Sequence, residues 1–334
     1  MSRHVYFSFP FAALCSWGIA FGCGSSNTAG GIATDGGARD DASLDAGATE
    51  DPRRPDADAA CADRAKAYCD KLFACFDAVV VSTYGDVTRC AERQKLACVP
   101  AILATGSTTT AGDVRACAAA LPGATCEDLF TLHAPPVACR PKAGSGAGGA
   151  TCAFDSQCAT SRCNEAGGCG SCTTRSSEGK DCRITDDCEY GLTCAASSKC
   201  RALVAVGAAC SDDAPCKPPA GCLQSQCVAA LEQGDVCDPL VDLCDPYRAL
   251  SCEPIGKRCA RVKFLPPGAD CAGYFPGSAR CATSSVCKKS DTTSRCLAAA
   301  ADGELCDASA GPLCMAPAIC SQGHCLVVDE NTCH

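Results

Sequence analysis

The chain is poor in large aromatic side chains and contains no run of basic residues. Aromatic residues make up 5% of the 334 positions, and there is one tryptophan. Because large apolar side chains supply most of the surface that a hydrophobic core buries, this composition excludes a single large core. The formal net charge of -9 disfavours a nucleic-acid partner, since phosphate binding needs clustered lysine and arginine.

Cysteine, in contrast, is abundant, with 36 residues. This content is typical of a disulfide scaffold in an oxidising compartment. Covalent links between small units are the physical alternative to a large core. We therefore predict an exported protein with a small disulfide-rich fold.

Residues 1–22 have the features of a signal peptide. Arg3 precedes an apolar stretch over 5–22 that is short for a membrane span. The following Ala20-Phe21-Gly22-Cys23 resembles the lipobox of bacterial lipoproteins. In that family the cysteine becomes the first mature residue and carries the acyl chains, which implies a lipid anchor at Cys23 in the cell envelope, with the outer membrane as the expected membrane. Ordinary signal cleavage, giving a free secreted protein, is the alternative.

Residues 23–59 are rich in glycine, alanine and aspartate and have almost no large apolar side chain. Such a stretch cannot bury enough surface to offset its ordering entropy, so we expect a disordered acidic tether. Removal of Cys15 with the signal peptide and acylation of Cys23 leave 34 cysteines, an even number as complete pairing requires.

Residues 60–140 are expected to form an all-α bundle stapled by disulfides, because good helix formers separate the cysteines. The predicted helices cover 61–76, 86–104, 113–121 before Pro122-Gly123, and a short fourth opened by a capping box at Thr125. Pro100 is expected to kink the second helix or to split it. The region contains eight cysteines, whose pairing the sequence leaves open: Cys61, Cys69, Cys75, Cys90, Cys98, Cys117, Cys126 and Cys139.

After a glycine-rich linker at 141–149, residues 150–334 form six repeats of four cysteines, each opened by a glycine three residues before the first cysteine. The sets are Cys152, Cys158, Cys163 and Cys169; Cys182, Cys188, Cys194 and Cys200; Cys210, Cys216, Cys222 and Cys227; Cys237, Cys244, Cys252 and Cys259; Cys271, Cys281, Cys287 and Cys296; and Cys306, Cys314, Cys320 and Cys325, with Cys172 and Cys333 left over.

Each repeat is too small to fold around a core of its own, so two local disulfides must hold it. We expect irregular structure with short β-hairpins at most. The glycine before the first cysteine is expected to supply a positive φ or a close turn. Stacking into an elongated rod is one arrangement open to such repeats.

The cysteine spacing over residues 152–200, with the C-x-x-C of Cys169 and Cys172, resembles the N-terminal cysteine-rich domain of the Dickkopf family. That family has ten cysteines including an adjacent pair, whereas this stretch has nine and Cys188 stands alone. The partner of Cys172 is therefore open, and Cys333 is one candidate. Dickkopf proteins are secreted antagonists of Wnt signalling in animals, an activity not expected behind a bacterial leader. The whole chain resembles a Dickkopf-like cysteine-rich lipoprotein of a Gram-negative bacterium.

Catalytic and metal chemistry are disfavoured by the residues present. A structural zinc site prefers two C-x-x-C pairs or cysteine with histidine, but there is one such pair, and the histidines beyond the leader are His133, His324 and His334. The C-x-x-C of Cys169 lacks the strand–helix setting of a redox pair, and no nucleophile motif accompanies a histidine. We predict no metal, no cofactor, no catalytic residue and no enzyme.

The function predicted from the sequence is a binding or structural module of the cell envelope, anchored in the membrane through its lipid. Rigid disulfide loops present side chains at a low ordering cost, and the expected partner is an extracellular protein or glycan. Exposed aromatic residues are candidate contacts, although each can equally pack against a disulfide: Tyr190, Tyr247, Tyr274 and Phe275. The alternatives are a secreted protease inhibitor and, less favoured, a redox or hydrolytic enzyme.

Overall fold

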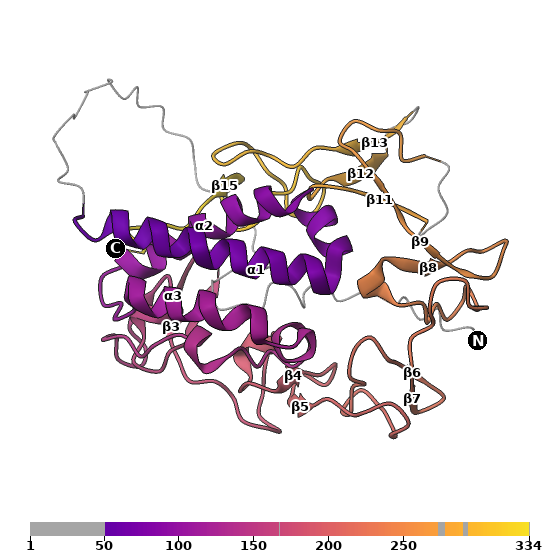
Figure 1. Cartoon of the computed structure of the whole chain (residues 1–334), viewed down its shortest axis with the longest axis horizontal. Coiled ribbons are helices and arrows are strands. Elements are labelled where there is room, and N and C mark those ends of the chain that lie inside the picture. Colours follow the sequence, from indigo (N-terminus) through magenta and orange to yellow (C-terminus); the bar gives the residue numbers. More distant parts are fainter. Residues whose placement is uncertain (1–50, 167, 273–277, 290–292, 334) are drawn as a thin grey trace, which may run out of the picture.

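The computed structural model describes residues 51–166, 168–272, 278–289 and 293–333. Three helices come first, and pairs of short strands follow them through the rest of the chain (Figure 1). The predicted signal peptide, Cys23 and most of the predicted tether lie outside the described residues. None of the helices in the described part of the chain combines the length and apolar content needed to cross a bilayer.

The helices are α1 (Arg54–Thr83), α2 (Val87–Leu103) and α3 (Ala111–Ala120). Helix α1 starts seven residues earlier than the predicted 61 and includes positions 54–59, which we had expected in the tether. A proline at its first turn suits a helix start, because the ring presets φ and the missing N–H has no helical partner there. The α1 backbone leaves helical geometry at Phe76, the predicted end of the first helix.

The next two helices begin within two residues of the predicted starts at 86 and 113. Asp86 caps α2 by accepting a hydrogen bond from the Arg89 N–H, and Thr110 and Asp113 form a capping box at α3. Pro100 lies inside α2 and does not end it. The predicted capping box at Thr125 is formed, with the Asp128 N–H donating to Thr125 Oγ1 over 2.9 Å, but it opens the π-helical turn η3 (Glu127–Thr131).

Four disulfides staple the helical region, and its interior contains α1, α2 and η3 side chains. Tyr68, Leu72 and Val80 of α1 pack against Leu129 and Phe130. The disulfides join Cys61 to Cys98, Cys69 to Cys90, Cys75 to Cys126, and Cys117 to Cys139. Each links segments that are far apart in sequence, so they fix the packing of the helices as well as the local turns.

The remaining chain contains short antiparallel hairpins, as predicted. The strands are β1 (Thr151–Cys152), β2 (Cys163–Ala166), β3 (Cys169–Cys172), β4 (Leu192–Cys194), β5 (Cys200–Ala202), β6 (Gly221–Leu223), β7 (Gln226–Val228), β8 (Leu250–Cys252), β9 (Cys259–Arg261), β10 (Lys263–Leu265), β11 (Ala279–Cys281), β12 (Val286–Lys289), β13 (Ser294–Leu297), β14 (Ile319–Ser321) and β15 (His324–Leu326). Strands β1 and β2 flank β3 in the first unit, and β10 pairs with β11 in parallel.

All six units share one disulfide pattern. The first cysteine pairs with the third and the second with the fourth, and the third and fourth lie opposite each other in the hairpin. The pairs are Cys152–Cys163 and Cys158–Cys172, Cys182–Cys194 and Cys188–Cys200, Cys210–Cys222 and Cys216–Cys227, Cys237–Cys252 and Cys244–Cys259, Cys271–Cys287 and Cys281–Cys296, and Cys306–Cys320 and Cys314–Cys325.

The glycine three residues before the first cysteine has a positive φ in every unit, between 79° and 92°. Its N–H donates to the carbonyl of the fourth cysteine over 2.7–2.8 Å, as at Gly207 and Cys227. The fourth cysteine's N–H donates back to the residue after the glycine. The predicted positive φ is therefore confirmed, and it directs the incoming chain onto the closing strand of the hairpin.

Each unit includes residues that precede its first cysteine and the glycine before it. The residue six positions before the first cysteine forms a parallel bridge with the second cysteine, as Gly146 does with Cys158 and Ala300 with Cys314. In the first unit this residue belongs to the segment 141–149, predicted as a flexible linker. Its Gly144 and Gly146 N–H groups donate to the Cys158 and Gln157 carbonyls over 2.7 and 2.8 Å, so this segment is packed onto the first unit.

The units curve around the helices and do not extend into a rod (Figure 1). The sixth unit returns to the first, where Cys333 forms a disulfide with Cys169 across a sequence separation of 164. The expected set of four in the first unit was wrong at one position, because Cys172 takes the place of Cys169. Cys172, named as a candidate partner of Cys333, pairs with Cys158.

Candidate functional site

The cysteine units contain clusters of sulfur atoms with the spacing of metal ligands. In five units, three Sγ atoms lie within 4.8 Å of one another, a spacing that suits a bound metal ion. The spacing arises because two disulfides pack against each other inside each unit. A disulfide sulfur is not the thiolate that binds zinc, so in the oxidised protein these groups are structural.

The C-x-x-C of Cys169 and Cys172 does not form a redox pair. The two cysteines belong to strand β3 and bond to different partners, Cys333 and Cys158. Their side chains alternate across the strand, which separates the two sulfurs. The structural role expected for this motif is therefore the observed one.

The two histidines that the structure describes lie in different surroundings. His324 is exposed on β15, its Nδ1 lies 3.0 Å from the Gly303 carbonyl oxygen, and its neighbour Cys325 is in a disulfide. His133 has a positive φ of 47° and lines a cavity described below. His334 lies outside the described residues. The two described histidines, His133 and His324, line no common cavity among those found.

A buried ionic cluster joins the first two units. Arg162 Nη2 lies 3.0 Å from Asp187 Oδ1, and Arg175 Nη2 lies 3.5 Å from Asp155 Oδ2. The Arg162 and Asp155 side chains are 6% and 5% exposed, so these charges are largely removed from water. Oppositely charged partners are what makes such burial tolerable.

Two carboxyls of this cluster are shifted toward the neutral form. Burial raises the pKa of Asp186 to about 7, against the opposing effect of the Arg162 and Arg175 charges. Burial also raises the pKa of Asp155. The Asp186 carboxyl is the group in this cluster whose charge changes near neutral pH.

The candidate aromatic contacts are engaged within the protein. The Tyr190 ring lies between the guanidinium groups of Arg140 and Arg175, each 4.6 Å from its centroid. The Tyr247 ring lies 4.4 Å from the Phe76 ring of α1. Both tyrosines therefore connect the units to the helical region. Tyr274 and Phe275 lie outside the described residues.

A large cavity lies between the helical region and the second to fifth units. Its volume is about 430 Å³, and its lining is mainly apolar. Four aromatic residues line it, namely Phe76, Phe130, Tyr247 and Phe264, together with Ala, Val, Leu and Pro side chains. Arg183, Arg280 and His133 add polar groups. A concave apolar site with a few polar groups is the usual form of a small-molecule site.

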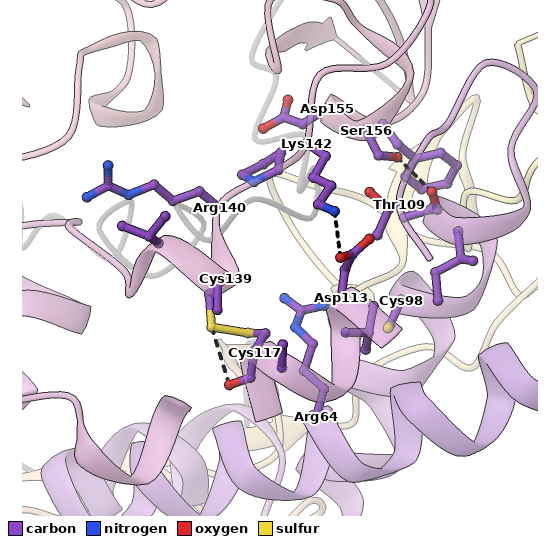
Figure 2. Close-up of a pocket in the computed structure, with 18 residues that line it drawn as sticks. Arg64, Cys98, Thr109, Asp113, Cys117, Cys139, Arg140, Lys142, Asp155 and Ser156 are labelled. Atoms are coloured by element: carbon purple, nitrogen blue, oxygen red, sulfur yellow. Dashed lines mark hydrogen bonds and ion pairs between the residues drawn. A yellow bond between two sulfur atoms is a disulfide. The ribbon is translucent and has the colours of Figure 1, made fainter. Parts of the chain in front are cut away.

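A second cavity, of about 160 Å³, lies where α1, α2 and α3 meet the first unit (Figure 2). Arg64 of α1, Asp113 of α3 and Lys142 line it. Lys142 Nζ lies 2.6 Å from Asp113 Oδ1. Burial lowers the pKa of Arg64. Neither cavity was predictable from the sequence, because the walls come from segments that are more than 100 positions apart for the larger cavity and about 90 for the smaller.

Comparisons with protein-family models, with curated proteins and with solved structures find none that matches the chain. The resemblance to the Dickkopf cysteine-rich domain therefore stays a prediction from cysteine spacing. The disulfides themselves place the chain among extracellular cysteine-rich modules, since 17 pairs persist only where thiols are oxidised.

Proposed function

We propose that the chain is an extracytoplasmic binding protein of the cell envelope, tethered through an acylated Cys23, and that the 430 Å³ cavity binds an apolar small molecule. The cavity is the observation that carries this proposal. Apolar surface left open to water is unfavourable, and a ligand that fills it removes that surface from water. An extracellular protein or glycan remains the partner expected for the outer surface.

The walls of the cavity are held in place covalently. Cys194 and Cys216 line it, and each is in a disulfide of its own unit. On the opposite wall, Phe76 follows Cys75, which is bonded to Cys126. A site whose walls are fixed before the ligand arrives loses little conformational entropy on binding.

The size and lining define the ligand class. A volume of about 430 Å³ lies at the lower end of the range for small-molecule sites. The aromatic rings in the lining favour a flat or unsaturated apolar group. The Arg183 and His133 side chains at the wall allow one polar end.

The experiment is a fluorescence titration of the full mature chain with N-phenyl-1-naphthylamine, an apolar probe that becomes bright in an apolar site. Saturable one-to-one enhancement is expected. Ala196 is exposed and lines the cavity, so Ala196→Phe should weaken binding by roughly 10-fold through obstruction. Ala202→Phe is the matched control, because Ala202 is exposed in the same unit and does not line the cavity. Equal affinity in the two variants, or no saturable binding, would refute the proposal.

A separate measurement tests the anchor. The intact mass of the mature protein from the membrane fraction should show Cys23 as the first residue, an added acyl mass and no free thiol. A soluble protein that begins at another residue would leave the binding proposal standing and remove the lipid.

A further inference from the structure

Arg64 is a half-buried arginine with no carboxylate partner among the described residues. It lies on α1 among the residues that line the 160 Å³ cavity, and also lines a smaller one beside Tyr190. Among the described residues, it has no hydrogen bond and no salt bridge. The largely buried arginines Arg93, Arg162 and Arg175 each have a carboxylate partner. Burial of an unpaired charge is costly, so a group that supplies the missing negative charge gains free energy on binding.

The acidic group in the same cavity is already committed. Asp113 Oδ1 lies 2.6 Å from Lys142 Nζ. Its Oδ2 accepts hydrogen bonds from Thr110 N over 3.0 Å and from Thr110 Oγ1 over 2.8 Å. Asp113 holds the start of α3 in this way, and Lys142 balances its charge. This pair leaves Arg64 as the uncompensated charge on this side.

The remaining charged residues at the cavity are directed elsewhere. The Arg140 guanidinium stacks on the Tyr190 ring, and Figure 2 shows it pointing away from Arg64. Asp155, at the far side, is paired with Arg162 and Arg175. Among the described residues, Arg64 is therefore the cation of this cavity that makes neither a hydrogen bond nor a salt bridge, in a chain whose net charge is -9.

The other walls are apolar and open to solvent at one edge. Ile102, Val114 and Phe154 line the interior, and Val137, which is 77% exposed, stands at the rim. We propose that this cavity binds a small monocarboxylate, with the carboxylate on the Arg64 guanidinium and an apolar group against these walls. The planar guanidinium matches a carboxylate with two parallel hydrogen bonds, and one unpaired charge suits a monoanion better than a phosphate dianion.

The site is independent of the larger cavity and is tested on the full mature chain by isothermal titration calorimetry with sodium benzoate and sodium hexanoate. We expect saturable binding with a Kd of about 1 mM or tighter. Benzamide, which has the shape of benzoate without its charge, and inorganic phosphate should bind at least roughly 10-fold more weakly.

The variant is Arg64→Gln, which keeps a polar side chain and removes the charge. Binding of benzoate should weaken roughly 10- to 100-fold, the usual range for a hydrogen-bonded charge pair. Lys66→Gln is the matched control, since Lys66 lies one half-turn away on the exposed face of α1 and should leave the Kd unchanged. Without ligand, Arg64→Gln should melt at the same temperature as the wild type or higher, because no partner is lost.

Three outcomes would overturn the assignment. Binding of benzoate by Arg64→Gln with the wild-type Kd would remove Arg64 from the site. Phosphate binding tighter than either carboxylate would replace the monocarboxylate by a phosphate-type anion. A lower melting temperature for Arg64→Gln would show that Arg64 has a stabilising partner, and that its role is structural.

Discussion

The disulfide between Cys169 and Cys333 is the contact whose removal tests the closed arrangement of the units most directly. It joins β3 of the first unit to the end of the sixth, 164 positions later. The double substitution Cys169→Ser with Cys333→Ser opens this link and leaves no free thiol. The sixteen other disulfides are untouched, so each unit keeps its own two links.

The magnitude follows from the loop that the bond closes in the unfolded chain. The unfolded chain keeps the disulfides of the later units, and one disulfide in each unit provides a covalent shortcut. The shortest covalent route from Cys169 to Cys333 is therefore about 100 residues. A loop of this length corresponds to about 4 to 5 kcal/mol of unfolded-state entropy, an upper value for the lost stability. For a chain of this size we expect the melting temperature, Tm, to fall by roughly 10 °C.

The assay is thermal unfolding followed by near-ultraviolet circular dichroism without reductant, together with peptide mapping of the disulfides in the wild type. The comparison variant is Cys210→Ser with Cys222→Ser, which opens a loop of 12 residues and should lower the free energy of unfolding less. A Cys169/Cys333 variant that melts with the wild type would refute the reasoning. So would a map in which Cys172, and not Cys169, is bonded to Cys333.

Three further predictions concern single residues. Gly207→Ala should lower the free energy of unfolding, measured by urea denaturation, by about 1 kcal/mol, because a side chain is strained at the Gly207 φ of 86°. An added Cβ has open space at both Gly207 and Gly148, but Gly148 has no positive φ, so Gly148→Ala should change the free energy of unfolding little. The pKa of Asp186 is about 7 in the folded chain and 3.8 in the unfolded chain, so the folded chain binds more protons between these values and its stability falls as pH rises through this window. Asp186→Asn should therefore reduce the difference in Tm between about pH 4 and about pH 7.5. An unchanged difference would show that another group titrates. Arg93→Gln should loosen the contact between the sixth unit and α2, since Arg93 Nη1 lies 2.6 Å from Asp302 Oδ2 and Nη2 donates to the Met315 carbonyl over 2.7 Å. The expected result is faster amide hydrogen exchange in residues 300–326, and unchanged exchange would contradict this prediction.

The helices were predictable where local signals were strong. The predicted starts at 86 and 113 lie within one and two residues of the observed starts of α2 and α3, where Asp86 and Thr110 cap the helices. The start of α1 was missed because the alternating aspartates and alanines at 56–59 resemble the tether before them. Alanine at 57 and 60 is nevertheless fully buried against α2, so tertiary packing extends the helix there.

The sequence by itself determined the features that depend on neighbouring residues. The cysteine periodicity and the preceding glycines predicted six small units with hairpins and a positive φ at Gly149 and its equivalents, because a turn is encoded within a few positions. The high cysteine content determined the compartment. These conclusions needed no knowledge of the path of the chain.

Only the tertiary structure decided which distant segments meet. It selected Cys169 over Cys172 as the partner of Cys333, placed Tyr190 between two arginines, and left Arg64 facing a cavity without a partner. The walls of both cavities come from helices and units that are distant in sequence. Cysteine spacing constrains each unit but not the angle between one unit and the next, and that angle decides how the units close around the helices.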